Sequence, residues 1–221
     1  MHKLYGRRKG KKLRQRQDAL MADFLPSVAV DLSGDLSLDT LFPFARKELR
    51  LEIGFGDGER LLDQASQHPD VAFLGCEPFV NGVAKAVAAI ADRGLTNIRI
   101  HDGDARDILS ALPAGALDRI ELLYPDPWPK RRHHKRRIVS DEFLAAAARV
   151  LKPGCELRFA TDIDDYCAWT LRHIERSKDF SWPATRPADW LTPWEGWAPT
   201  RYEQKARREG RPSAYLAFIR R

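Results

Sequence analysis

A glycine-rich turn at residues 52–58, reading EIGFGDG, is the first segment whose residue types could hold a small ligand. Its glycines are Gly54, Gly56 and Gly58. Glycine adopts positive φ without strain and lets a ligand approach the backbone closely. The dinucleotide fingerprint G-x-G-x-x-G would need its third glycine at position 59, which is Glu59. Because Glu59 and Glu52 would repel a pyrophosphate, the turn favours a ligand with a cationic amino-acid part and no phosphate.

Two further acids follow predicted strands. Glu77 comes directly after a strand predicted at 71–76, and Asp104 follows one predicted at 97–101. An acid at the end of the second strand can accept hydrogen bonds from both hydroxyls of a ribose, and Asp104 could accept one from an adenine amino group. Together with the glycine turn, these positions predict an S-adenosylmethionine site of the class I methyltransferase type. A tight turn without a ligand would explain the glycines alone, but not the two acids.

The segment 124–130, reading YPDPWPK, combines an acid, an aromatic ring and a cation. Asp126 lies between two prolines, which stiffen the backbone and so fix the direction of its carboxylate. Trp128 offers a face on which an unstacked base can stack. Lys130 and the basic run 131–137 could contact phosphates. The segment therefore predicts a nucleic-acid substrate; the alternative is an exposed proline-rich loop with incidental charge.

Positive charge is concentrated in two parts of a chain whose formal net charge is +6. Residues 1–16 carry eight Lys/Arg and no acid, and residues 130–137 carry six Lys/Arg. The rest of the chain holds more acids than bases. Each segment alone could be a solvated tail or loop, but the asymmetry as a whole favours a polyanionic partner.

Short apolar strands alternate with helices along most of the chain. Strands are predicted at 50–55, 71–76, 97–101, 117–124, 155–160 and 213–221, and helices at 59–67, 80–93, 141–151 and 164–178. This alternation predicts an α/β fold with a doubly wound, mostly parallel, Rossmann-like sheet. We expect seven strands, with an antiparallel C-terminal strand. In such sheets ligands bind beyond the carboxyl ends of the strands, where the candidate acids fall.

A chain of 221 residues with 43% hydrophobic residues has enough material for one α/β domain. We expect this domain at 49–221, after a basic, flexible arm at 1–25 and a linker at 26–48. No apolar run approaches the ~20 residues that span a bilayer. The cysteines lack the spacing of metal ligands, so we expect a reduced, cytoplasmic protein without a bound metal. They are Cys76, Cys155 and Cys167. No obligatory protein partner is evident from the sequence.

Six segments together resemble the motif set of the bacterial tRNA (guanine-N7)-methyltransferases. They are LEIGFGDG (51–58), GCEPF (75–79), YPDPWPK (124–130), KRRI (135–138), FATDI (159–163) and TRYEQKARREG (200–210). The likeness runs in order across residues 50–218, and its most specific part is the block from PDPWPK to KRR.

This resemblance implies methyl transfer from S-adenosylmethionine to N7 of a guanine in the variable loop of tRNA, leaving S-adenosylhomocysteine. It implies that Asp126 is catalytic and that the cofactor contacts are Glu52, Glu77, Asp104 and Asp126. The implied substrate contacts are Lys130, Arg132, Lys135, Arg136, Arg137, Asp162, Thr200, Arg201, Tyr202 and Glu203. The basic residues 1–16 lie outside the matching region.

Guanine N7 is a lone-pair nucleophile without a proton to lose, so positioning can supply most of the acceleration. The carboxylate of Asp126 can stabilise the positive charge that moves onto the purine. Two alternatives stay open. An exocyclic-amine methyltransferase would carry D/N-P-P-Y/W after the fourth strand, whereas this chain has D-P-W. A non-catalytic RNA-binding module could retain the same fold.

Overall fold

The computed structural model describes residues 5–34 and 36–221. The strands are β1 (Glu48–Ile53), β2 (Val71–Cys76), β3 (Ile98–His101), β4 (Leu117–Leu123), β5 (Leu151–Thr161), β6 (Phe180–Ser181) and β7 (Ala214–Arg220). The helices are α1 (Gln15–Asp23), α2 (Leu25–Val28), α3 (Leu38–Leu41), α4 (Glu59–Gln67), α5 (Val80–Arg93), α6 (Ala105–Ala111), α7 (Asp141–Val150), α8 (Asp164–Arg176), α9 (Ala188–Leu191) and α10 (Arg201–Arg208), with the 3-10 helix η1 (Arg131–Arg136).

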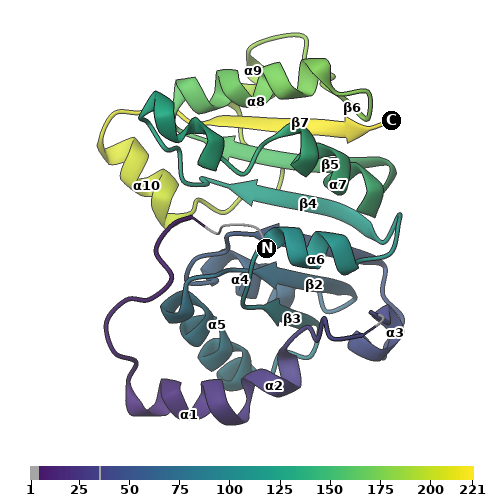
Figure 1. Ribbon diagram of the computed structural model, residues 1–221, viewed down its shortest axis with the longest axis vertical. Coiled ribbons are helices and arrows are strands. Elements are labelled where there is room, and N and C mark those ends of the chain that lie inside the picture. Colours follow the sequence, from purple (N-terminus) through teal and green to yellow (C-terminus); the bar gives the residue numbers. More distant parts are fainter. Residues whose placement is uncertain (1–4, 35) are drawn as a thin grey trace. The chain divides into compact units, whose positions relative to one another are not determined.

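The strands form a seven-stranded sheet in the order β3-β2-β1-β4-β5-β7-β6 (Figure 1). Strand β1 pairs in parallel with β2, β2 with β3, and β4 with β5, while β7 is antiparallel to β5. This confirms the predicted α/β fold with a mostly parallel sheet and an antiparallel C-terminal strand. The chain divides into two compact units, residues 1–113 and 114–221, which are described in turn.

In the first unit, three parallel strands bring their carboxyl ends level. The pairing of β1 with β2 ends with Ile53 opposite Cys76, and that of β2 with β3 ends with Cys76 opposite His101. The residues that follow these three strand ends therefore share one edge of the sheet. Glu77 and the glycine turn begin directly at this edge, which explains how segments far apart in the sequence can form one site.

Helix α5 covers this part of the sheet with an apolar face. Val83, Val87 and Ile90 are completely buried at the spacing of successive helical turns. The helix ends at Gly94, whose φ of 62° is the left-handed conformation that terminates many helices. Its start is fixed close to the glycine turn, because a Cβ on Gly82 would lie only 2.2 Å from the backbone oxygen of Gly56.

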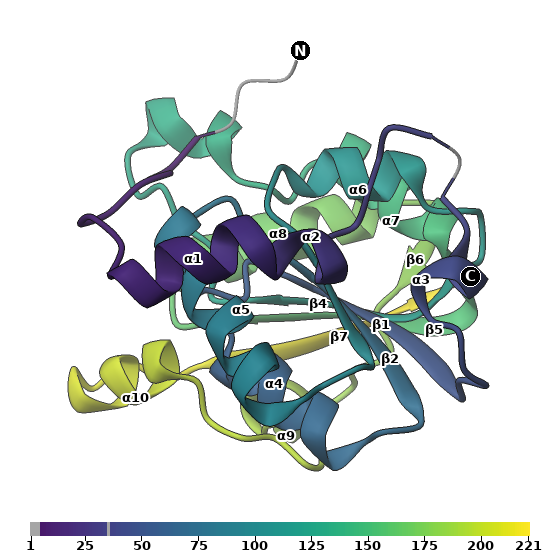
Figure 2. The same ribbon diagram turned by 90° about the horizontal axis from the view of Figure 1, so that it is seen from below.

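Residues before β1 pack against the same helix. Helix α1 lies beside α5 (Figures 1 and 2), and Leu20, Met21 and Phe24 pack against the hydrophobic core of the unit. Nearer the N-terminus, Gly10 donates its N–H to Asn81 Oδ1 at 2.6 Å. The arm and linker boundaries at residues 25 and 48 stay predictions, but Arg8, Gly10 and Lys11 of the arm form hydrogen bonds with the start of α5.

In the second unit, β4 and β5 are parallel, while β7 and β6 continue the sheet as antiparallel strands. Helices α7 and α8 lie on the same face of these strands (Figure 2). Helix α7 ends at Val150, as expected from the sequence Lys152-Pro153-Gly154. Strand β5, however, begins at Leu151, earlier than predicted, because Leu151 already pairs with Leu117; the register then shifts before Arg119 pairs with Glu156.

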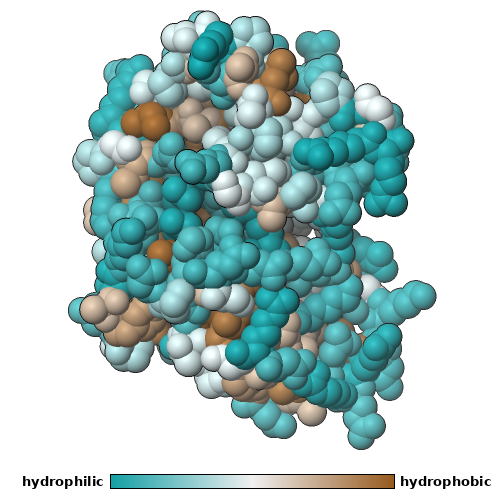
Figure 3. All heavy atoms as spheres, turned by 180° about the vertical axis from the view of Figure 1, so that it is seen from behind, coloured by the Kyte–Doolittle hydropathy of each residue, from teal (hydrophilic) through white to brown (hydrophobic). Residues whose placement is uncertain are grey.

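The surface is mainly polar on the face drawn in Figure 3, where hydrophobic residues form small patches separated by hydrophilic ones. Among the described residues, no helix is long and apolar enough to cross a membrane.

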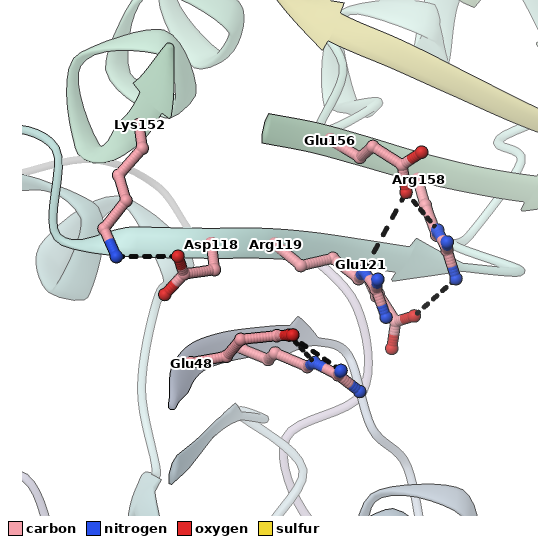
Figure 4. A network of polar contacts seen from close by, with 8 residues as sticks. Glu48, Asp118, Arg119, Glu121, Lys152, Glu156 and Arg158 are labelled. Carbon is pink, nitrogen blue, oxygen red and sulfur yellow. Dashed lines mark hydrogen bonds and ion pairs between the residues drawn. The ribbon is translucent and has the colours of Figure 1, made fainter. Parts of the chain in front are cut away.

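Charged side chains on β4 and β5 form cross-strand pairs (Figure 4). Arg158 lies opposite Glu121 in the register, with 3.9 Å between Nη1 and Oε1, and also binds Glu156 at 2.7 Å. Lys152 binds Asp118 at 2.6 Å. Opposite charges at facing positions favour this register over one shifted by a residue. The register in turn sets where β4 ends and the loop containing Asp126 begins.

Candidate functional site

The glycine turn has the backbone conformation that only glycine adopts without strain. The φ angles are 77° at Gly54, 61° at Gly56 and 82° at Gly58. A Cβ at Gly54 would have no heavy atom within 4 Å, whereas one at Gly58 would lie 3.0 Å from Ala86 Cβ. The turn is thus packed against α5 at one end and open at the other, where its backbone is accessible to a ligand.

Glu77 ties the turn to the end of β2. Its side chain is buried, and its two carboxylate oxygens accept hydrogen bonds from the N–H groups of Gly56 at 2.8 Å and Phe79 at 2.9 Å. A carboxylate offers about four acceptor positions. These bonds are therefore compatible with the predicted acceptance of ribose hydroxyls, which stays a prediction.

Cations that the sequence did not identify lie beside the other acids of the first unit. Glu52 pairs with Arg60 at 3.2 Å, and Asp57 pairs with Lys85 at 2.6 Å. Asp104 caps α6 by accepting the N–H of Arg106 at 3.0 Å, and the guanidinium of Arg106 also binds its carboxylate. These partners orient the carboxylates. Of these contacts, only the cap of α6 by Asp104 could have been recognised from the local sequence, because Asp is a common N-cap residue and Arg106 is two residues away.

The acids nevertheless produce a negative field at the carboxyl ends of these strands. Burial raises the pKa of the Cys76 thiol well above its usual value, and the nearby carboxylates of Glu77, Asp104, Asp107 and Asp102 raise it further. Several carboxylates thus lie close enough to Cys76, the last residue of β2, to affect its pKa. Such a field stabilises a cationic ligand and disfavours a phosphate. Among the described residues, no group of His, Cys, Asp and Glu could hold a metal ion.

In the second unit, Asp126 lies on a loop with unusual backbone geometry. Tyr124 and Trp128, two residues to either side, have φ angles of 50° and 44°. A bulky residue rarely adopts this left-handed conformation, which costs on the order of 1–3 kcal/mol and persists only where neighbours enforce it. Such strain is typical of functional loops.

Several contacts hold the strained loop. Tyr124 donates its N–H to Ala160 O at 2.8 Å and its hydroxyl to Ser213 Oγ at 2.9 Å. The guanidinium of Arg136 lies over the Trp128 ring, 4.9 Å from its centre. Both strained residues are thus anchored, and the backbone of Asp126 between them is fixed.

Asp126 itself has a different environment from the acids of the first unit. It is an exposed residue that makes no hydrogen bond or ion pair with another described residue. Surrounding protein atoms still exclude part of the solvent, and this desolvation raises the pKa of its carboxyl above the usual value. A positioned carboxylate without a partner can interact with positive charge that develops on a substrate.

The predicted RNA-contact stretch divides into exposed and buried residues. Lys130, Arg132 and Lys135 are exposed, and Arg136 is partly buried by its contact with Trp128. The Arg137 side chain is completely buried, which conflicts with its predicted role as a phosphate contact.

Arg137 instead connects the loop to α8. Its Nε donates to the Pro127 carbonyl at 2.9 Å, and its Nη2 binds the Asp165 carboxylate. Its guanidinium also lies between the rings of Tyr166 and Trp169, at 4.8 and 5.2 Å. Because its donors are directed at the protein, we assign Arg137 a positioning role.

The segment at 200–203 begins helix α10. Thr200 caps the helix by accepting the N–H of Glu203 at 3.1 Å. Glu203 is completely buried and accepts hydrogen bonds from Trp197 Nε1 at 2.6 Å and Tyr215 OH at 2.7 Å. A direct substrate contact by Glu203 therefore conflicts with its position. The T-x-x-E pattern, which is typical of helix N-termini, could have indicated this structure.

The remaining predicted substrate residues are accessible. Arg201 and Tyr202 are exposed at the start of α10, and Asp162 is partly buried and pairs with Arg211 at 2.7 Å. Their contacts with a substrate stay predictions.

The strand order, the glycine turn and the acids at the strand ends together define the class I methyltransferase fold. The solved structure of the 16S rRNA methyltransferase KamB has this fold with a TM-score of 0.61, at 17% sequence identity over 88% of this chain and 99% of its own.

A family model described as a putative methyltransferase matches residues 46–216, and the chain belongs to this family. A curated tRNA (guanine-N(7)-)-methyltransferase of Rhodopseudomonas palustris (strain BisB18) is 54% identical, covering 98% of this chain and 87% of its own length. One of Agrobacterium fabrum is 52% identical, covering 98% and 94% respectively.

Proposed function

We propose that this methyltransferase transfers a methyl group from S-adenosylmethionine to N7 of a guanine in tRNA. The observation that carries the proposal is the 54% identity, over 98% of the chain, with a curated enzyme of that name. The variable loop is the target that the motif resemblance implies, and a cytoplasmic location would follow from the tRNA substrate.

The residues of the first unit fit S-adenosylmethionine by their chemistry. The ligand is cationic at sulfur, carries an amino acid and a ribose, and has no phosphate. The turn at 54–58 exposes backbone at Gly54, and the acids at the strand ends give a negative field. We propose that Glu52 and the turn bind the amino-acid part, Glu77 the ribose and Asp104 the adenine amino group, with Asp126 as a further contact.

When bound, S-adenosylmethionine supplies a methyl group that is already activated by the positive sulfur. The residues of this chain have to align the purine and stabilise its developing charge. Trp128 offers a ring held by Arg136, on which the base can stack. The unpaired carboxylate of Asp126 can stabilise positive charge on the purine, and its fixed backbone lowers the cost of reorganisation.

Exposed cations beside this loop are suited to RNA phosphates. Lys130, Arg132 and Lys135 are exposed and make no ion pair with another described residue. Their contacts would fix the position of the RNA rather than read its sequence.

The experiment is incubation with labelled S-adenosylmethionine and unmodified tRNA, followed by chain cleavage specific for 7-methylguanosine. We expect label in tRNA and cleavage in the variable loop. Label without cleavage would favour the exocyclic-amine alternative. Binding of tRNA without label would favour a non-catalytic module. The Asp126→Asn variant is the control for contaminating activity.

A further inference from the structure

A second basic site lies in the second unit, between η1 and α8. A surface pocket of about 520 Å³ is lined there by two residues of η1 and five of α8. Those of α8 occur at positions 165, 169, 172, 173 and 176, a spacing that places them on one face of the helix. Asp165 and Trp169 of this face contact Arg137, whereas Arg172, His173 and Arg176 have no part in the proposed reaction.

The pocket carries excess positive charge. Arg131 and Arg172 are exposed, and neither lies within ion-pair distance of a carboxylate in the described chain, although the charge of Arg172 acts on Asp165. Arg176 also lines the pocket and shares the Asp141 carboxylate with His173. The acid of the pocket, Asp165, is bound by Arg137, and this hydrogen bond lowers the pKa of its carboxyl. Converging cations of this kind favour an anionic ligand.

The wall of the pocket is aromatic and fixed in place. Trp169 donates its Nε1–H to the Val139 carbonyl at 2.9 Å. Its ring contacts those of His134 and His173, with centres 5.6 and 4.8 Å apart. Arg137 lies against the same ring. Because these contacts already order the side chains, little further conformational entropy is lost when a ligand binds.

This chemistry matches a nucleotide within an RNA chain better than a free phosphate. Two unpaired guanidinium groups can bind phosphate oxygens, while the aromatic wall can contact a ribose or base. The pocket also adjoins Lys130, Arg132 and Lys135 through η1. RNA bound along η1 could therefore continue into it.

We propose that this pocket binds a nucleotide of tRNA other than the target guanosine, and that it contributes affinity rather than chemistry. The proposal rests on the proposed function for the identity of the RNA. Arg172 is the residue we expect to make the phosphate contact, because it is exposed, unpaired by a carboxylate and central on the α8 face.

The test compares Arg172→Glu with Lys178→Glu in the full-length protein. Lys178 is also exposed and unpaired, lies just beyond α8 and gives the same change in net charge. The dissociation constant for unmodified tRNA is measured at several salt concentrations, together with kcat at saturating tRNA. We expect Arg172→Glu to weaken binding on the order of tenfold. The slope of log K against log salt should fall by roughly 0.7–0.9 for one lost phosphate contact.

Turnover at saturating tRNA and S-adenosylmethionine affinity should stay at the wild-type values. Equal effects of Arg172→Glu and Lys178→Glu would overturn the proposal, because only general electrostatics would then be involved. A loss of turnover with unchanged tRNA affinity would also overturn it. If the wild-type protein binds tRNA without forming 7-methylguanosine, the proposed function fails, but the comparison of dissociation constants still decides the role of the pocket.

Discussion

Asp126 combines an exposed position with an environment that partly removes water from its carboxyl. Desolvation raises its pKa, and no cation among the described residues pairs with it to offset this effect. The acids of the first unit, by contrast, are held by Arg60, Lys85 and Arg106. The difference suits different tasks. Partnered acids orient a ligand, whereas an unpartnered carboxylate can respond to charge that forms during the reaction.

We predict that kcat/KM falls as the pH is lowered through the pKa of Asp126, because protonation removes the negative charge that stabilises the purine. This acid limb should lie above the ordinary aspartate pKa of 3.8. It is measured as a pH–rate profile with unmodified tRNA. Asp126→Asn should abolish transfer at every pH, and near-normal activity in that variant would mean that Asp126 is only a turn residue.

The same pKa shift makes a prediction about stability. A raised pKa means that the folded state binds the proton of Asp126 more tightly than the unfolded state does. Protonation therefore stabilises the fold. This contribution is complete below the pKa of the unfolded state and is lost as the pH rises through the pKa of the folded state. At neutral pH, Asp126→Asn should therefore unfold at the same or a higher temperature than the wild type. Thermal unfolding followed by circular dichroism checks this, and a clear loss of stability would indicate a structural role.

Glu77 provides a second prediction at the level of single residues. In Glu77→Gln the amide has one acceptor oxygen for the N–H groups of Gly56 and Phe79, and its NH2 group must face a donor. Hydrogen bonds to a charged group contribute about 1.5–3 kcal/mol each. We expect S-adenosylmethionine to bind on the order of 10- to 100-fold more weakly in a calorimetric titration.

The matched control is Asp63→Asn, which removes an exposed acid of α4. It should leave the affinity unchanged. A Glu77→Gln protein that binds S-adenosylmethionine normally would refute the assignment of Glu77.

At the scale of elements, the strained loop and α8 are joined through Arg137. The sequence predicted a rigid acid between prolines, and the structure has a fixed loop there. The sequence did not indicate that Arg137 is buried, because the partners of Arg137 are distant along the chain. Pro127 is 10 residues away and Asp165 is 28 residues away. Within a run of six Lys/Arg, no local pattern distinguishes the one that turns inward.

We predict that Arg137→Met lowers kcat on the order of a hundredfold, since displacement of a reacting group by ~1 Å can have an effect of this size. The affinity for tRNA and its salt dependence should change little, because Arg137 does not reach the surface. Loss of the buried hydrogen bonds should also reduce the free energy of unfolding by about 1–3 kcal/mol, measured by denaturant titration.

Arg132→Ala is the opposite case. Arg132 is exposed and unpaired, so its loss should weaken tRNA binding and flatten the salt dependence while kcat stays near the wild-type value. If Arg137→Met behaves like Arg132→Ala, Arg137 is an RNA contact and our positioning role is wrong.

At the scale of the whole molecule, the sequence predicted the alternation of strands and helices well, because hydrophobic runs and glycine or proline stops mark each element. Strand β2 and helices α4 and α5 have the predicted bounds. The packing of α1 on α5 was not predicted. The residues of helix α1 are polar on average. Only Leu20 and Met21, with Phe24 just beyond the helix, form an apolar face.

The N-terminal segment therefore has two parts with different expected effects. Residues 1–12 carry six Lys/Arg, so their deletion should weaken tRNA binding and flatten its salt dependence, with turnover at saturating tRNA nearly unchanged. Deletion of residues 1–28 also removes the apolar contacts with α5 and the buried Val28, and should destabilise the fold. Saturation curves at two salt concentrations and thermal unfolding distinguish these effects.

A fall in turnover after deletion of residues 1–12, as large as that of Arg137→Met, would contradict the division between binding and catalysis. The segment would then belong to the active-site assembly. The hydrogen bonds of Arg8 and Gly10 with the start of α5 make this comparison necessary.

The central claim is that this chain methylates N7 of guanine in tRNA. The most direct measurement is analysis of the nucleosides of unmodified tRNA after reaction with wild-type protein and with Asp126→Asn. We predict that 7-methylguanosine forms with the wild type, as the principal methylated nucleoside, and is absent with the variant. Methylation at an exocyclic amine instead, or equal 7-methylguanosine with both proteins, would contradict the account.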